Sequence, residues 1–217
     1  MGASFDILTK PWVPVLDAAG QKTELGLLET LERAHELQAI QTASPMEEYS
    51  VYRFLIVFLM DALRPEDGEE DIGGLLEAEQ FDMEAIQDYL TQCRKEGVSF
   101  DLFDAARPFL QTAYVEAWDR EAKPVSTLDY TIPNGNNHIH FDHRRNEISY
   151  TPGKALRMLL TAQNFCTAGA QGYPSNVNGA PPWFALIQGK TLFQTLVLGM
   201  IGTDEILLPF DEPPVLW

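Results

Sequence analysis

Positive charge is scarce in this sequence. It carries 15 lysine and arginine residues against 32 aspartate and glutamate residues, for a formal net charge of −17. A protein that holds nucleic acid through its phosphates needs a basic surface, because neutralising phosphates supplies most of the sequence-independent affinity. The composition therefore argues against a free-standing nucleic-acid-binding protein. The acid is concentrated between residues 64 and 90, which is most simply a solvated stretch that maintains solubility.

Cysteines and long apolar runs are also scarce. Cys93 and Cys166 are the 2 cysteines and have no C-x-x-C spacing, so the sequence predicts neither a metal knuckle nor a disulfide framework. The longest apolar run, residues 54–60, is far shorter than the roughly 20 residues that cross a bilayer. The amino terminus shows no signal-peptide pattern. We expect a cytoplasmic protein that does not associate with membranes.

The apolar pattern predicts a single α+β domain over residues 1–217, with long ordered loops. Ser44, Pro45 and Glu47 form an S-x-x-E capping box that should start a central helix. Pro11 and Pro14 should keep the opening segment at an edge or in an ordered arm, because proline cannot donate within a central strand. Helices are expected at 25–38, 44–64, 82–95, 151–169 and from 192, and strands at 137–142, 147–150 and 183–188.

One motif has the residue pattern of a metal site. His138, His140, Asp142 and His143 read H-x-H-x-D-H, which resembles the first metal-binding motif of the metallo-β-lactamase superfamily. No histidine follows position 143, so the further ligands of that superfamily are missing, and His35 is expected on the surface of a helix. Alternation would place His138 and His140 on one polar face of a strand without any metal. We therefore predict no metal, and a metal-dependent hydrolase remains the alternative.

Other catalytic patterns are absent from the sequence. It contains no G-x-S-x-G elbow, no GK[ST] phosphate loop and no H-E-x-x-H. Cys166 has no histidine near it in sequence and is expected to be a buried structural thiol. Asp101 and Asp104, in FDLFD, are expected to accept local hydrogen bonds in turns and caps. The chain is accordingly predicted to be no enzyme and to use no cofactor.

Four blocks, in order, resemble the CasA family, the large subunit of the type I-E CRISPR complex Cascade. They are the arm FDILTKPWVPV, the helix pair around 25–63 with its S-P-x-E-E connection, FDLFDAARPFLQT, and IPNGNNHIHFDH leading into a T-P-x-x-A-x-R-x-L-L helix and a glycine loop. The resemblance implies a non-catalytic subunit in antiviral defence. Its implied partners are guide RNA, target double-stranded DNA at the PAM, other Cascade subunits and a recruited helicase-nuclease.

The resemblance also implies where nucleic acid would bind. A loop over 134–143 would support PAM sensing and contacts to guide RNA, and a glycine loop over 169–172 would approach the minor groove, where a glycine backbone fits and amides meet base edges. Ordinary structural roles stay open: a turn at Asn134, a core position for Phe141 and a helix cap at Gly169. The candidate residues are Asn134, Asn136, Asn137, His140, Phe141, Asp142, His143, Arg144, Gly169, Gln171 and Gly172.

Members of this family are roughly twice as long and continue into a carboxy-terminal four-helix bundle, which has no counterpart here. We therefore expect an amino-terminal piece, or a short or split large subunit, that binds free duplex weakly by itself. A protein-binding scaffold that never touches nucleic acid is a further alternative.

Overall fold

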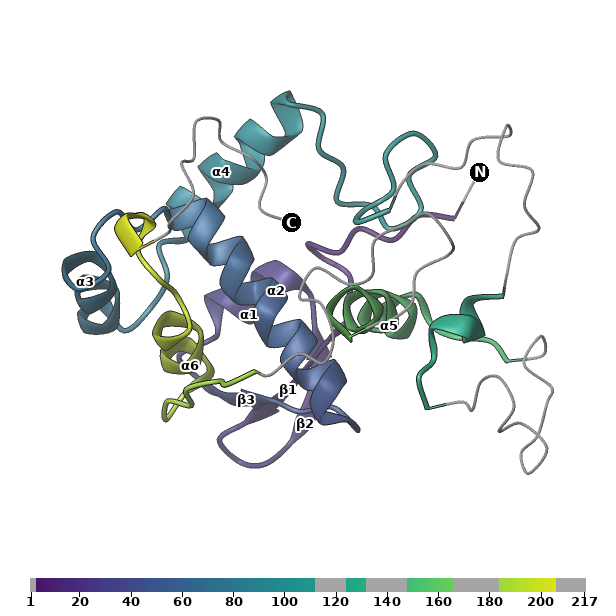
Figure 1. Ribbon diagram of the computed structural model, residues 1–217, viewed down its shortest axis with the longest axis horizontal. Helices are drawn as coiled ribbons and strands as arrows, with labels where there is room; N and C mark the ends of the chain where they lie inside the picture. Colours follow the sequence, from purple (N-terminus) through teal and green to yellow (C-terminus); the bar gives the residue numbers. More distant parts are fainter. Residues whose placement is uncertain (1–2, 112–123, 132–147, 166–183, 206–217) are drawn as a thin grey trace.

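The computed structural model describes residues 3–111, 124–131, 148–165 and 184–205. In this part of the chain, a small antiparallel sheet with strand order β2-β1-β3 lies at one edge of a group of helices (Figure 1). The strands are β1 (Val13–Asp17), β2 (Lys22–Leu25) and β3 (Leu37–Ile40). The mixed α+β class predicted from the sequence is confirmed.

The central strand contains a proline, contrary to the sequence prediction. Pro14 lies in β1 opposite Glu24 of β2, so the segment 13–17 is neither an edge strand nor an arm. The proline is tolerated because pairing with β3 starts only at the next residue, where Val15 lies opposite Ile40. Its carbonyl still accepts a hydrogen bond from the Gln41 N–H at 3.0 Å. The one group that Pro14 lacks is a backbone N–H. At the start of the ladder, its absence costs no hydrogen bond to β3.

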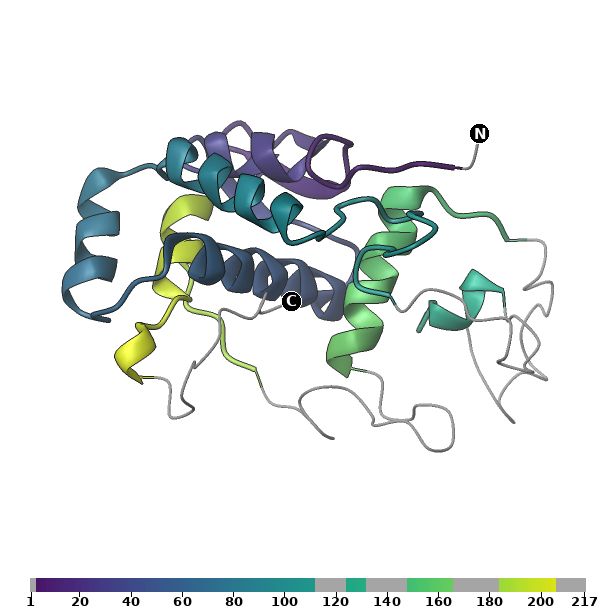
Figure 2. The same cartoon turned by 90° about the horizontal axis from the view of Figure 1, so that it is seen from above.

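The longest helix, α2, runs through the middle of the molecule (Figures 1 and 2). Packed against it are α4, α5 and α6. The views agree that α5 crosses α2 steeply, whereas α3 and α6 lie together toward the other end of α2. The helices are α1 (Leu27–Glu32), α2 (Pro45–Leu63), α3 (Glu70–Ala78), α4 (Met83–Lys95), α5 (Pro152–Phe165) and α6 (Leu192–Leu198), with short 3-10 turns η1 (Val125–Leu128) and η4 (Thr203–Glu205).

The predicted start of α2 is confirmed, but only half of the predicted capping box forms. Ser44 is the N-cap, and its hydroxyl accepts the Met46 N–H at 3.2 Å, with Pro45 in the first helical position. Glu47 does not reach back to the cap. Its carboxylate binds basic side chains of α5 instead.

Four other sequence predictions are corrected. The helix expected over 25–38 is α1 alone, because residues 37–40 pair with β1. The acidic region contains an unpredicted helix, α3, whose Ile72, Leu75 and Leu76 lie at helical spacing and pack, partly buried, against the core. Residues 184–188, expected to form a strand, have no regular structure. The strand expected at 137–142 lies outside the described residues. Of the strand expected at 147–150, residues 148–150 are described and have no regular structure.

A single apolar core joins these elements. Trp12 from the arm before β1 is fully buried, and its indole donates to the Ile7 carbonyl at 2.8 Å. Its ring meets Phe54 of α2 edge-on at 5.8 Å, and Phe54 in turn meets Phe109 at 5.7 Å. The arm is thus fixed to the core by Trp12. In the part of the chain that the structure describes, no helix has the length and apolarity needed to span a membrane.

Candidate nucleic-acid interface

The predicted nucleic-acid-binding residues all lie outside the described residues, in 132–147 and 166–183. What the structure does describe is the scaffold from which both segments leave. Helix α5 lies between them in sequence: the first segment precedes its start at Pro152, and the second follows its end at Phe165. Its predicted start is confirmed, and its helical residues are described to position 165. The geometry of α5 therefore determines where the first segment ends and where the second begins.

A buried ion cluster fixes the first half of α5. The Nε of Arg157 donates to Glu47 Oε1 of α2 at 2.6 Å, and its Nη1 reaches Glu24 Oε1 of β2 at 2.8 Å. The same Nη1 also donates to the Trp12 carbonyl at 2.8 Å. Lys154 donates to the second oxygen of Glu47, whose side chain is only 3% exposed. A buried carboxylate with two cations and an arginine fork is a geometrically demanding arrangement, so it holds α5 in one orientation.

Further contacts support the same helix at each end. At the start, a Cβ on Gly153 would lie 3.1 Å from the Pro11 carbonyl oxygen and 3.1 Å from the Trp12 Cβ, so α5 packs closely on the arm. Near its end, Arg53 Nη1 of α2 donates to Asn164 Oδ1 at 3.0 Å. Helix α5 is therefore held to α2 at both ends.

The first candidate segment is tied at its base by a tyrosine and an aspartate. The Tyr150 hydroxyl donates to Asp129 Oδ2 at 2.9 Å. This hydrogen bond joins the backbone just after η1 to the backbone shortly before α5. Thr131 adds a backbone N–H to Asp129 Oδ1 at 3.0 Å. Burial alone would raise the pKa of Asp129, but these donated hydrogen bonds outweigh it and lower the pKa below its usual value. The carboxylate thus stays ionised and keeps the two flanks together.

The second candidate segment is tied at its base by an aromatic cluster. Phe165 and Phe184, which flank the undescribed residues 166–183, have ring centroids 5.1 Å apart. Tyr49 of α2 stacks on Phe184 at 4.2 Å and meets Phe165 edge-on at 6.1 Å. We call Tyr49, Phe165 and Phe184 the aromatic clasp. It brings the two ends of the second segment to the same place on α2.

Two of the sequence blocks that carry the family resemblance lie side by side. The Leu102 N–H donates to the Phe5 carbonyl at 3.0 Å, and the Ile7 N–H donates to the Phe100 carbonyl at 3.0 Å. Asp101 accepts the Phe5 and Phe103 N–H groups at 3.0 and 2.8 Å. This local role was predicted for Asp101 from the sequence and is confirmed. The carboxylate positions backbone, and nothing in its surroundings suits acid-base chemistry.

Asp104 confirms the same prediction. It accepts the backbone N–H groups of Ala106 and Arg107 at 2.8 and 2.9 Å, and the Ser99 hydroxyl at 2.8 Å. The hydrogen bonds that Arg107 and Ser99 donate lower the pKa of Asp104. Asp101 and Asp104 are therefore turn acceptors.

The other chemically suggestive residues offer no catalytic arrangement among the described residues. In those ranges no three histidine, cysteine, aspartate or glutamate side chains come together as metal ligands, and the H-x-H-x-D-H motif lies outside them. His35 is exposed as expected, although it lies in the turn after α1 and not within a helix. Burial raises the pKa of the Cys93 thiol, which disfavours a reactive thiolate. Cys166 lies outside the described residues.

Comparison with known proteins decides the family. The family model described as CRISPR-associated protein Cse1 matches residues 6–216, nearly the whole chain. The chain belongs to the Cse1 family. The CasA resemblance of the sequence blocks is thereby confirmed, since a curated relative from Thermus thermophilus, CRISPR-associated protein CasA/Cse1, is 34% identical over 220 residues.

Solved structures of the Cse1 family share the fold. The crystal structure of Thermobifida fusca Cse1 matches with a TM-score of 0.78 at 26% identity, covering 98% of this chain and 42% of that one. A chain of a structure described as a CRISPR RNA-guided surveillance complex matches with a TM-score of 0.73 at 23% identity, over 92% of this chain and 44% of that one, which is a likeness of fold. The match to the Thermus thermophilus relative covers 98% of this chain but 43% of the relative. The present chain therefore spans less than half of the length of these relatives.

Several residues that form this scaffold were missed by sequence reasoning. Arg157, Asp129, Tyr150 and the clasp residue Tyr49 act through partners far away in the chain, so no local spacing marks them. One signal was present, however. An arginine near the start of a helix full of leucines is costly to bury unless it is paired. That rule would have flagged Arg157 as part of a buried pair, without naming Glu47.

Proposed function

We propose that this chain is a non-catalytic subunit of a type I-E CRISPR Cascade surveillance complex, which contributes to guide RNA docking and to recognition of target DNA at the PAM. The observation that carries the proposal is the match to the Cse1 family over residues 6–216. In RNA-guided recognition, base pairing reads the long target while protein reads only the short flanking motif. A subunit of this kind needs rigidly placed loops and no catalytic group.

The anchoring of α5 supports this role. Both candidate loops start from fixed points, one beside the Asp129–Tyr150 hydrogen bond and the other at the aromatic clasp. Loops that carry recognition residues are effective when a rigid scaffold positions them. We propose that the loop over 134–143 contacts guide RNA, neighbouring subunits and the PAM, and that the loop over 169–172 approaches the minor groove.

The distribution of charge supports binding within an assembly. Residues 64–90 carry ten acidic side chains and one basic one, and most of them lie on α3, α4 and their connections, away from α5. Phosphates would be repelled from that face. We therefore propose that the protein engages DNA only when neighbouring subunits and guide RNA hold it in place, and that the chain alone binds free duplex weakly.

The experiment that tests this role is co-expression with a guide RNA and the Cascade backbone subunits. Co-purification of guide RNA and binding of a PAM-containing duplex are compared between the wild type and an Asn137→Ala/Phe141→Ala variant. We expect the variant to lose at least about tenfold in duplex affinity, as expected when an amide-base contact and a stacked ring are removed. A Gln87→Ala/Phe103→Ala variant, which removes an exposed amide and an exposed ring elsewhere, serves as the control.

Three results would contradict the proposal. The first is failure of the chain to join the complex. The second is tight, salt-resistant binding of free duplex by the chain alone. The third is stoichiometric zinc in the purified protein that disappears in His140→Ala, which would favour the metal-dependent hydrolase instead.

A further inference from the structure

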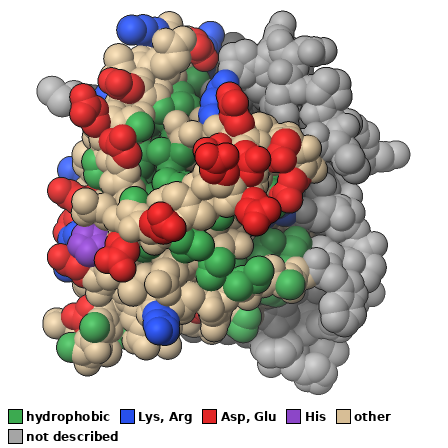
Figure 3. All heavy atoms as spheres, turned by 90° about the vertical axis from the view of Figure 1, so that its left-hand side faces the viewer, with side chains coloured by type: hydrophobic (Ala, Val, Ile, Leu, Met, Phe, Trp, Pro, Cys, Tyr) green, Lys and Arg blue, Asp and Glu red, His purple; other side chains and the backbone are tan. Residues whose placement is uncertain are grey.

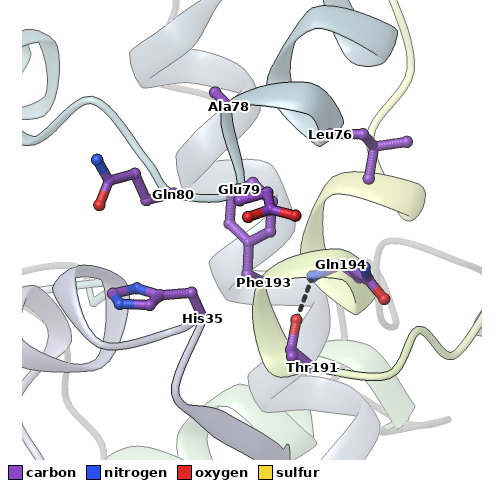
Figure 4. A pocket seen from close by; sticks show the side chains of 8 residues that line it. All are labelled: His35, Leu76, Ala78, Glu79, Gln80, Thr191, Phe193 and Gln194. Atoms are coloured by element: carbon purple, nitrogen blue, oxygen red, sulfur yellow. Dashed lines mark hydrogen bonds between the residues drawn. The ribbon is translucent and has the colours of Figure 1, made fainter.

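A pocket opens on the acidic side of the molecule, remote in sequence from both candidate loops. Its volume is about 430 Å³, and it lies between the end of α3, the turn after α1 and the start of α6. Figure 4 shows its side chains around one opening, with Glu79 near the centre. Three segments that are distant in sequence thus contribute to one concave site.

The lining of this pocket combines an apolar surface with hydrogen-bond acceptors. Leu76, Ala78 and Phe193 supply the apolar part. Among the described residues, no hydrogen bond or ion pair engages the side chains of Glu79 and Gln80. The carboxylate of Glu79 therefore has unused capacity for four or so hydrogen bonds, as expected of an ionised acid.

The surroundings of the pocket are negative. Figure 3 shows acidic side chains spread over this face with apolar side chains between them. Three basic residues lie in or beside the lining segments. His35 lines the pocket, with its Nε2 3.9 Å from Glu36 Oε1, and Arg33 is paired with Glu29 at 3.1 Å and with Glu36 at 3.3 Å. Lys190 is exposed, and acidic residues outnumber these basic ones on this face. A cationic guest is therefore favoured, and a nucleic-acid phosphate is repelled.

We propose that this pocket receives an arginine side chain from a partner protein. The aliphatic part of an arginine would lie along Leu76 and Ala78, while its guanidinium would donate to Glu79 and Gln80. Arginine fits better than lysine because its planar group carries five donors and loses less hydration on burial. The site is independent of the proposed nucleic-acid function, since it shares no residue with either candidate loop.

The backbone at Glu79 provides a way to test the role of this side chain separately from folding. Glu79 follows α3 with φ 58°, a left-handed conformation that favours glycine. A carboxylate at this position thus costs stability that a glycine would not. Glu79→Gly should raise the melting temperature and abolish arginine binding. If Glu79 had only a structural role, the more stable variant would still bind arginine.

The probe is the peptide acetyl-Leu-Arg-Leu-amide, titrated into the isotopically labelled 217-residue chain and followed by amide chemical shifts. We expect saturable shifts confined to residues 76–80 and 191–194. The same peptide with citrulline in place of arginine keeps the shape but removes the charge, and it should bind at least about fivefold more weakly. Equal binding of the two peptides would overturn the proposal, as would shifts spread over the whole acidic face.

Matched variants test whether the arginine binds in the pocket. Glu79→Gln should weaken binding at least about fivefold, and Ala78→Trp should block it by filling the pocket. Glu77→Gln makes the same charge change on the same helix outside the pocket lining, and it should alter the affinity less than twofold. If Glu77→Gln and Glu79→Gln weaken binding equally, the attraction is only a general effect of acidic charge and the pocket is not an arginine site.

Discussion

Arg157 of α5 and Glu47 of α2 form a buried ion pair, with Nε and Oε1 2.6 Å apart and side chains only 10% and 3% exposed. Glu47 lies in the first turn of α2, so the pair connects the central helix to the helix from which both candidate loops leave. Removing Glu47 would take the buried carboxylate from both Arg157 and Lys154, and Arg157 would keep only Glu24, whose side chain is 44% exposed. The pair therefore yields the first prediction.

Glu47→Gln should lower the free energy of unfolding by about 3 kcal/mol, because Arg157 and Lys154 both lose the buried carboxylate that they share. Urea denaturation followed by circular dichroism measures the change. Glu29→Gln is the control: its pair with Arg33 has side chains 52% and 40% exposed, and its loss should cost less than about 1 kcal/mol. Similar losses in the two variants would show that the α2–α5 pair has no special role.

The Asp129–Tyr150 hydrogen bond predicts a pH dependence. The pKa of Asp129 is lowered in the folded protein, so its contribution to stability is fully present above the ordinary value of about 3.8 and is lost as the pH falls through the lowered value. Tyr150→Phe removes a donor and should raise the pKa of Asp129 toward that ordinary value. A carboxyl-carbon NMR titration measures it. Thr127→Val, whose hydroxyl donates to Pro124 and not to Asp129, should leave the titration unchanged.

The aromatic clasp predicts that the residues after Phe184 open more readily when the Tyr49 ring is removed. Tyr49→Leu removes two ring contacts, and each aromatic pair contributes about 0.5–1.5 kcal/mol beyond burial. Amide hydrogen exchange over 184–188 should accelerate, because Phe184 would lose its stacking partner. Tyr49→Phe keeps the rings and should exchange like the wild type, as should Tyr130→Leu, whose ring is 38% exposed. Unchanged exchange in Tyr49→Leu would mean that the clasp does not hold these residues.

Two glycine substitutions should have opposite effects. A Cβ on Gly26 would lie 2.8 Å from the Thr9 carbonyl carbon and oxygen and 2.9 Å from the Leu8 oxygen, so Gly26→Ala should destabilise the protein by about 1–3 kcal/mol. A Cβ on Gly73, inside α3, would meet nothing within 4 Å, so Gly73→Ala should stabilise it by about 0.5–1 kcal/mol. Thermal unfolding measures both. A stable Gly26→Ala variant would show that the arm can move away from β2.

The sequence predicted elements whose causes are local. The cap and first-turn proline at Ser44 and Pro45 located α2, Asp82 and Gly97 bounded α4, and Thr151 with Pro152 located the start of α5. Each rests on side chains that bind or shape their own neighbouring backbone. Such signals need no knowledge of the tertiary structure.

The elements that the sequence misassigned depend on distant partners. Leu37 has helical spacing from Ala34, yet it pairs with Asp17 in a sheet. Pro14 stands in a central strand because β3 ends before reaching it. The scaffold of the candidate interface was missed for the same reason, since Glu47 finds Arg157 more than a hundred residues away. Spacing along the chain contains no information about such pairs.

Helix α5 also sets the distance between the point where the first candidate segment ends and the point where the second begins. It has 14 residues, and at about 1.5 Å per residue its ends are about 20 Å apart. Successive base pairs of a duplex rise by about 3.4 Å, so this separation corresponds to about six base pairs. Under the proposed function, the end of the first candidate segment and the start of the second would therefore lie about six base pairs apart along a duplex that runs parallel to α5.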